Sequence, residues 1–124
     1  MIEVKLFIKS TSGLYVSNKV YKFIKSYETG NEDGNIDNEA LKKLQKLAER
    51  NFERDGVNIR HEGHGVFRIS LPRNGRIIGF HDEYDFIAIN CFKKPRQKLN
   101  KGQQKIIKDV KRIRKNKLWK RSIK

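Results

Sequence analysis

The stretch VFRISLPRNGRIIGFHDEYDFIAINCF, residues 66–92, decides the fold. It contains three short runs rich in β-branched and aromatic residues, a composition typical of strands. The runs are residues 66–71, 76–81 and 86–92. Between them lie RNG (73–75) and DEYD (82–85), which have the composition of turns. The pattern therefore predicts a meander of three antiparallel strands.

Before the meander, the sequence predicts one strand and two helices. Apolar and other residues alternate over residues 2–8, the signature of a half-buried strand. Ser17 is suited to cap a first helix, and apolar residues recur from Val20 to Tyr27 at helical spacing. A second helix is expected to start at Asp37 or Asn38 and to stop at Gly56. Its apolar face is Leu41, Leu44, Leu47, Ala48 and Phe52. Residues 28–37, ETGNEDGNID, read as a loop.

After the meander, a basic helix is expected from about Asn100, with Ile106, Val110 and Ile113 on one stripe. The predicted order is β-α-α-β-β-β-α, an α+β fold with a small antiparallel sheet, two N-terminal helices and a basic C-terminal helix. At 124 residues, the chain fits one domain, whose basic helix and tail occupy about residues 100–124.

The charge of the chain is concentrated near its C-terminal end. Residues 1–92 hold 14 Lys and Arg against 13 Asp and Glu, whereas residues 93–124 hold 15 against 1. A block of one sign repels itself until an anion neutralises it. We therefore expect a polyanion or an acidic protein as the partner.

Several classes of protein do not fit the composition. No stretch approaches the roughly 20 apolar residues of a membrane span, and the first residues lack the pattern of a signal peptide. Cys91 is the only cysteine, which excludes an intramolecular disulfide. His61 and His64 form an H-x-x-H in a loop, but no matching carboxylate and histidine set accompanies them. We therefore expect a cytoplasmic protein with no membrane association, no metal and no cofactor.

Basic side chains fall at the middle and the ends of the predicted strands. Arg68 lies in the first, Arg76 opens the second, and Lys93 and Lys94 close the third. Two turn geometries remain open. A two-residue turn at Asn74-Gly75 pairs Arg73 with Arg76 and sets Arg68 opposite His81, with Arg76 on the face of the apolar residues. A three-residue loop with a bulge at Gly75 sets Pro72 opposite Arg76, which then shares a face with Arg68 and Ser70.

Residues 65–99, GVFRISLPRNGRIIGFHDEYDFIAINCFKKPRQKL, resemble the C-terminal half of the RelE/HigB toxins of bacterial toxin–antitoxin pairs. In that family, a strand with a basic residue leads to a strand that opens with arginine. A third hydrophobic strand ends in phenylalanine and consecutive basic residues before a last helix. Arg68, Arg76 and Phe92-Lys93-Lys94 match these features, and the preceding β-α-α order is also similar.

The resemblance implies a metal-free endoribonuclease that cuts mRNA on the ribosome and is silenced by a cognate antitoxin. Arg68, Arg76 and Lys94 would stabilise charge on the scissile phosphate. Lys93, Arg96 and Lys98 would contact RNA, and Tyr84 would stack on a base. The basic helix would meet ribosomal RNA or the antitoxin.

The general base and acid are not fixed by the resemblance. Where relatives carry a second lysine, this chain has Ser70. Because the unperturbed pKa of histidine suits proton transfer at neutral pH, His81 is the candidate substitute, ahead of His61 and His64. The alternative function is a non-catalytic RNA- or ribosome-binding protein that acts through its basic helix alone.

Overall fold

The computed structural model describes residues 1–30, 32–94 and 100–122. Seven strands form one sheet in the order β5-β6-β7-β8-β2-β1-β9, and β3 and β4 form a separate hairpin. The strands are β1 (Ile2–Lys9), β2 (Gly13–Ser17), β3 (Glu28–Gly30), β4 (Ile36–Asn38), β5 (Ile59–Gly63), β6 (Val66–Leu71), β7 (Gly75–Asp82), β8 (Asp85–Lys93) and β9 (Trp119–Arg121). The helices are α1 (Asn18–Lys25), α2 (Glu39–Glu49) and α3 (Lys101–Lys115). Most neighbours are antiparallel, but β2 pairs with β8, and β1 with β9, in parallel.

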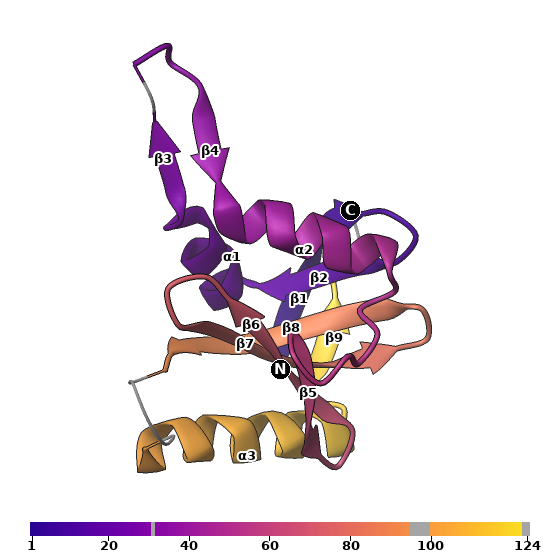
Figure 1. Ribbon diagram of the computed structural model, residues 1–124. Helices are drawn as coiled ribbons and strands as arrows, with labels where there is room; N and C mark the ends of the chain where they lie inside the picture. The colour runs from indigo at the N-terminus through magenta and orange to yellow at the C-terminus, as the bar shows by residue number, and fades with distance from the viewer. Residues whose placement is uncertain (31, 95–99, 123–124) are drawn as a thin grey trace.

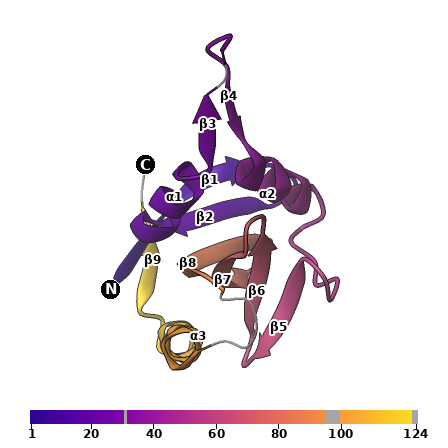
Figure 2. The same cartoon turned by 60° about the vertical axis from the view of Figure 1, so that its left-hand side comes forward.

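The sheet separates two layers of helices, with α1 and α2 on one face and α3 on the other (Figures 1 and 2). Each face has its own hydrophobic cluster. Tyr27, Leu44 and Phe52 pack on the first face against Ile69 and others. On the second face, the buried side of α3 covers strand residues that alternate with those of the first face. These strand residues include Val4, Val66, Ile78, Phe80 and Ile87.

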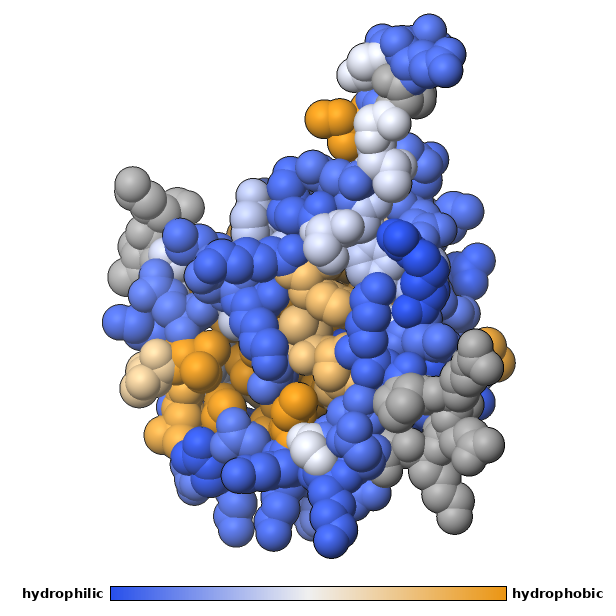
Figure 3. Space-filling model, turned by 90° about the vertical axis from the view of Figure 1, so that its left-hand side faces the viewer, coloured by the Kyte–Doolittle hydropathy of each residue, from blue (hydrophilic) through white to orange (hydrophobic). Residues whose placement is uncertain are grey.

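Figure 3 shows the end of the molecule that lies at the left in Figure 1. Hydrophilic side chains cover the lower edge and most of the hairpin arm at the top, from which one apolar group also projects. An apolar strip lies between them, at the height where the sheet separates the two helical layers.

All three predicted helices are present, and their caps explain where they begin. Ser17 accepts a hydrogen bond from the Val20 amide, and Asn38 accepts one from the Leu41 amide. Asn100 and Gln103 form a reciprocal capping box at the start of α3. The second helix ends at Glu49, earlier than expected, because Asn51 and Phe52 take left-handed backbone angles.

The α+β class with a mainly antiparallel sheet is confirmed, and the three meander strands are present as β6, β7 and β8. The element order is longer than predicted, because β2, β5 and β9 were not expected from the sequence. Residues 28–37 are also not simply a loop. Glu28–Gly30 pairs with Ile36–Asn38 to form an arm that projects from the body (Figure 1).

In the part of the chain that the structure describes, no helix is long and apolar enough to cross a membrane.

Trp119 packs its ring against Phe80 at 5.4 Å between centroids, so β9 closes the cluster beneath α3.

Candidate nucleic-acid interface

Arg68 and Arg76 lie on the same face of the sheet, the one covered by α3. In the register of β6 and β7, Ser70 lies opposite Arg76, and Leu71 lies opposite Gly75. Directly opposed residues share a face, as do residues two apart in a strand. The connection is residues 72–74, in which Arg73 and Asn74 are left-handed. The two-residue turn is therefore wrong. The pairing of Pro72 with Arg76 is also wrong, although the shared face expected from it is present.

The Nε atoms of both arginines are buried. The side chain of Arg68 is 11% exposed, and its Nε lies 3.2 Å from Glu62 Oε1. Arg76 is half-buried, and its Nη1 donates a 2.7 Å hydrogen bond to the Gly75 carbonyl. In the described residues, neither Nε atom has a hydrogen-bond partner. Burial, and then the charge of Arg68, lower the pKa of Arg76. Two half-buried cations, each with a buried Nε–H that lacks a hydrogen bond, are suited to binding an anion.

The backbone of Lys94 lies beside the start of β7, the strand that carries Arg76. Its amide donates a 2.7 Å hydrogen bond to the Asn74 carbonyl, which holds it at the turn from which β7 begins. Lys93 lies opposite Gly75, a residue of the other face, and its Nζ is 6.0 Å from the centre of the Tyr27 ring. The fold therefore directs Lys93 away from Arg68 and Arg76.

His81 also faces away from Arg68 and Arg76. Its Nε2 lies 2.8 Å from the Phe52 carbonyl, and its ring packs between Phe67 and Phe86. These contacts belong to the face covered by α1 and α2. The structure does not bring His81 together with the arginines, so we withdraw it as the proton carrier of that site.

The remaining candidates are dispersed. Tyr84 is 83% exposed in the turn between β7 and β8. This turn follows the end of β7, whereas Arg76 lies at the start of that strand. His61 accepts a hydrogen bond from the Gly65 amide through Nε2, and the carbonyl of His64 accepts one from Arg114. Arg96 and Lys98 lie outside the described residues. No group of His, Cys, Asp and Glu in the described ranges is arranged to hold a metal.

Two cations that were not predicted as site residues also lie near Arg76. Arg60 of β5 lies directly opposite Arg68, and its charge contributes to the lowered pKa of Arg76. Lys43 of α2 is half-buried, and burial and then the charge of Arg76 lower its pKa. If β5 had been expected as a strand paired with β6, Arg60, eight residues before Arg68, could have been placed opposite it. No sequence signal pointed to Lys43.

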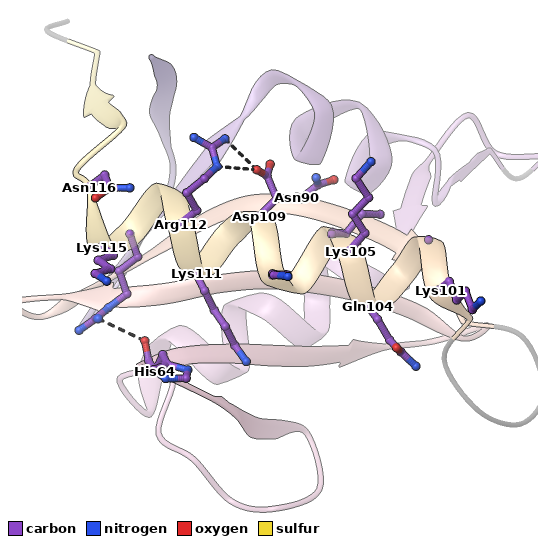
Figure 4. A pocket seen from close by; sticks show the side chains of 14 residues that line it. His64, Asn90, Lys101, Gln104, Lys105, Asp109, Lys111, Arg112, Lys115 and Asn116 are labelled. Atoms are coloured by element: carbon purple, nitrogen blue, oxygen red, sulfur yellow. Dashed lines mark hydrogen bonds and ion pairs between the residues drawn. The ribbon is translucent and has the colours of Figure 1, made fainter.

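The outer surface of α3 forms a second cationic region. It lines a solvent-open depression of about 1350 Å³ that also includes His64 and Asn90. Lys111 and Gln104 project to the side of His64, whereas Lys105 and Arg112 project to the opposite side (Figure 4). The exposed cations of the helix are Lys101, Lys105, Lys108, Arg112, Arg114 and Lys115. Its one acidic residue, Asp109, pairs with Arg112 at 2.8 Å.

Comparison of the chain with protein-family models, with curated proteins and with solved structures finds no significant match.

Proposed function

We propose that this protein is a RelE/HigB-like toxin, a ribosome-dependent and metal-free endoribonuclease that cleaves mRNA. One observation carries the proposal. Arg68 and Arg76 come from adjacent strands to one face of the sheet, and each keeps a buried Nε–H that makes no hydrogen bond to any described residue. A phosphodiester supplies the acceptor oxygens that these groups lack.

The chemistry requires the ribose 2′-hydroxyl to lose its proton and attack the adjacent phosphorus while the 5′-oxygen leaves. Negative charge grows on the phosphate oxygens during this step. Donors already fixed around the phosphate stabilise that charge with little reorganisation, which is typically the largest contribution in such sites. We assign this role to Arg68 and Arg76, with Lys94 as the third cation.

The proposed partners are mRNA on the ribosome, ribosomal RNA and an antitoxin. The exposed cations of α3 and the excess of basic residues after residue 92 support a phosphate surface for ribosomal RNA. An acidic or amphipathic segment of an antitoxin would compete for the same cations. Because the proposed substrate is mRNA on translating ribosomes, we propose that the protein acts in the cytoplasm.

Primer extension on mRNA after induced expression tests the proposal. The wild-type protein should produce cuts within codons. Arg76→Ala should reduce them at least about 100-fold, because it removes a donor to the transition state. Arg54→Ala, a change at an exposed arginine before β5, is the matched control and should leave the cuts intact. Unchanged cutting by an Arg68→Ala, Arg76→Ala double variant would refute this site.

A second candidate function is favoured by α3, whose exposed side is almost entirely cationic. A non-catalytic protein could bind ribosomal RNA through this helix alone. Reversing the charge of Lys105, Lys108 and Lys115 would then abolish ribosome binding, whereas Arg68→Ala and Arg76→Ala would have little effect. Growth arrest and ribosome co-sedimentation of the two variant sets distinguish the candidates.

A further inference from the structure

We infer that Arg60 binds a second phosphate of the RNA, one nucleotide away from the phosphate held by Arg68 and Arg76. The inference rests on the proposed function, because it extends the same site. It assigns a substrate path across the strands, from β7 over β6 to β5.

The register places the three arginines on one face of three adjacent strands. Arg60 is the direct partner of Arg68, and Arg76 lies on the diagonal from Arg68, opposite Ser70. Direct partners have Cβ atoms about 5 Å apart, and diagonal neighbours about 7–8 Å. With strands roughly 4.8 Å apart, the three residues cover roughly 10 Å of the sheet. This is a surface for an extended chain of phosphates rather than for one ion.

The charges of this face are not balanced within the described part of the protein. Like charges directly opposite one another destabilise a pair of strands. Glu62 approaches Arg68 Nε, but it is one carboxylate for three guanidinium groups. The nearby Asp55 is already engaged, since its Oδ1 accepts hydrogen bonds from the amides of Val57, Asn58 and Ile59. An anion from outside would remove the repulsion.

Arg60 is both exposed and held in place, unlike a solvated surface arginine. Its Nε donates a 2.9 Å hydrogen bond to the Gly56 carbonyl, which leaves the terminal nitrogens for a ligand. The Gly56 segment is itself fixed, because the Asn58 carbonyl accepts a 2.8 Å hydrogen bond from the Ser70 amide of β6. An incoming backbone therefore meets Arg60 at the surface and Arg68 and Arg76 deeper in the site.

The test uses RNA that cannot be cut. A 2′-O-methyl dinucleotide has one internal phosphate, a 2′-O-methyl trinucleotide has two, and neither has the hydroxyl needed for cleavage. Binding is followed by ¹H–¹⁵N spectra of the arginine Nε–H groups. The wild type should bind the trinucleotide about tenfold more tightly than the dinucleotide. Arg60→Met should bind both equally and lose about 0.7 from its salt slope with the trinucleotide.

Two further variants define the outcome. Arg54→Met should keep the tenfold gain, and Arg60→Lys should keep only part of it, because lysine retains the charge without the two-pronged geometry. A gain that persists in Arg60→Met, or no gain in the wild type, overturns the subsite. Circular dichroism confirms that each variant is folded.

The same experiments separate this inference from the nuclease proposal. If Arg76→Ala leaves mRNA cuts unchanged while the gain still depends on Arg60, the nuclease proposal fails and the RNA path stands. If Arg76→Ala abolishes the cuts and no gain depends on Arg60, only the second subsite fails.

Discussion

Replacing Arg76 with methionine should make the protein more stable while it removes activity. The change deletes the hydrogen bond from Nη1 to the Gly75 carbonyl, a loss of about 1 kcal/mol. It also removes a buried Nε–H that has no hydrogen-bond partner among the described residues, a gain of about 1–3 kcal/mol. The relief of repulsion with Arg68 adds roughly 0.2–1 kcal/mol. Methionine has a similar length and keeps the packing.

The expected net effect is an increase of about 1 kcal/mol in the free energy of unfolding, which corresponds to roughly 4 °C in Tm for a chain of this size. Urea denaturation with an unchanged m-value measures it. Arg54→Met, at an exposed position, should stay within about 0.5 kcal/mol of the wild type. A loss of more than about 1 kcal/mol in Arg76→Met would show that the arginine supports the fold, and the reasoning for a prepared anion site would be refuted.

Three other predictions concern the scaffold. Gly79→Ala should destabilise the protein by about 2–4 kcal/mol in urea denaturation, because the added Cβ would lie 2.0 Å from the Ile87 carbonyl oxygen. The control is Gly30→Ala, whose Cβ would have nothing within 4 Å and which should cost under about 1 kcal/mol. Equal effects of the two changes would contradict this explanation. Burial raises the pKa of Cys91 to about 11. The thiol of the native protein should therefore react with a disulfide reagent at pH 8 about 100-fold more slowly than the thiol of the denatured protein. Equal rates would contradict the burial of Cys91. Hydrogen bonds from the amides of Ile59 and Val57 lower the pKa of Asp55, so the ionised carboxylate stabilises the fold above about pH 4, and this stabilisation declines as the pH falls through the lowered pKa. Asp55→Asn should therefore reduce the free energy of unfolding by about 1 kcal/mol at pH 7 and by less at pH 3. A reduction that does not change with pH would contradict this explanation.

The parts of the fold that the sequence predicted are those with strong local signals. The helices are marked by Ser17, Asn38 and Asn100 at their caps, and the meander by its apolar runs. The missed strands have weak signals of their own. β5 is IRHEG, which is mostly polar, and it is a strand because β6 supplies the hydrogen bonds. β9 has three residues and depends on β1 in the same way.

The candidate site shows the same division. Arg68 and Arg76 were selected from the sequence, but their shared face depended on the length of the turn, which composition did not determine. Arg76 and His81 are different, because they lie five positions apart in one strand and side chains alternate between faces. That parity alone opposes His81 as a partner of Arg76. Arg60 required long-range pairing, which no local pattern contains.

The parallel pairing of β9 with β1 has a consequence for biosynthesis. β1 is made long before its outer neighbour β9 and before α3, the helix that covers the second hydrophobic cluster. Val4, Phe80 and Ile87 therefore lack their cover in the nascent chain until residues 101–121 have been translated. The first cluster needs residues only up to Cys91, so the second cluster is the later of the two to be completed during synthesis.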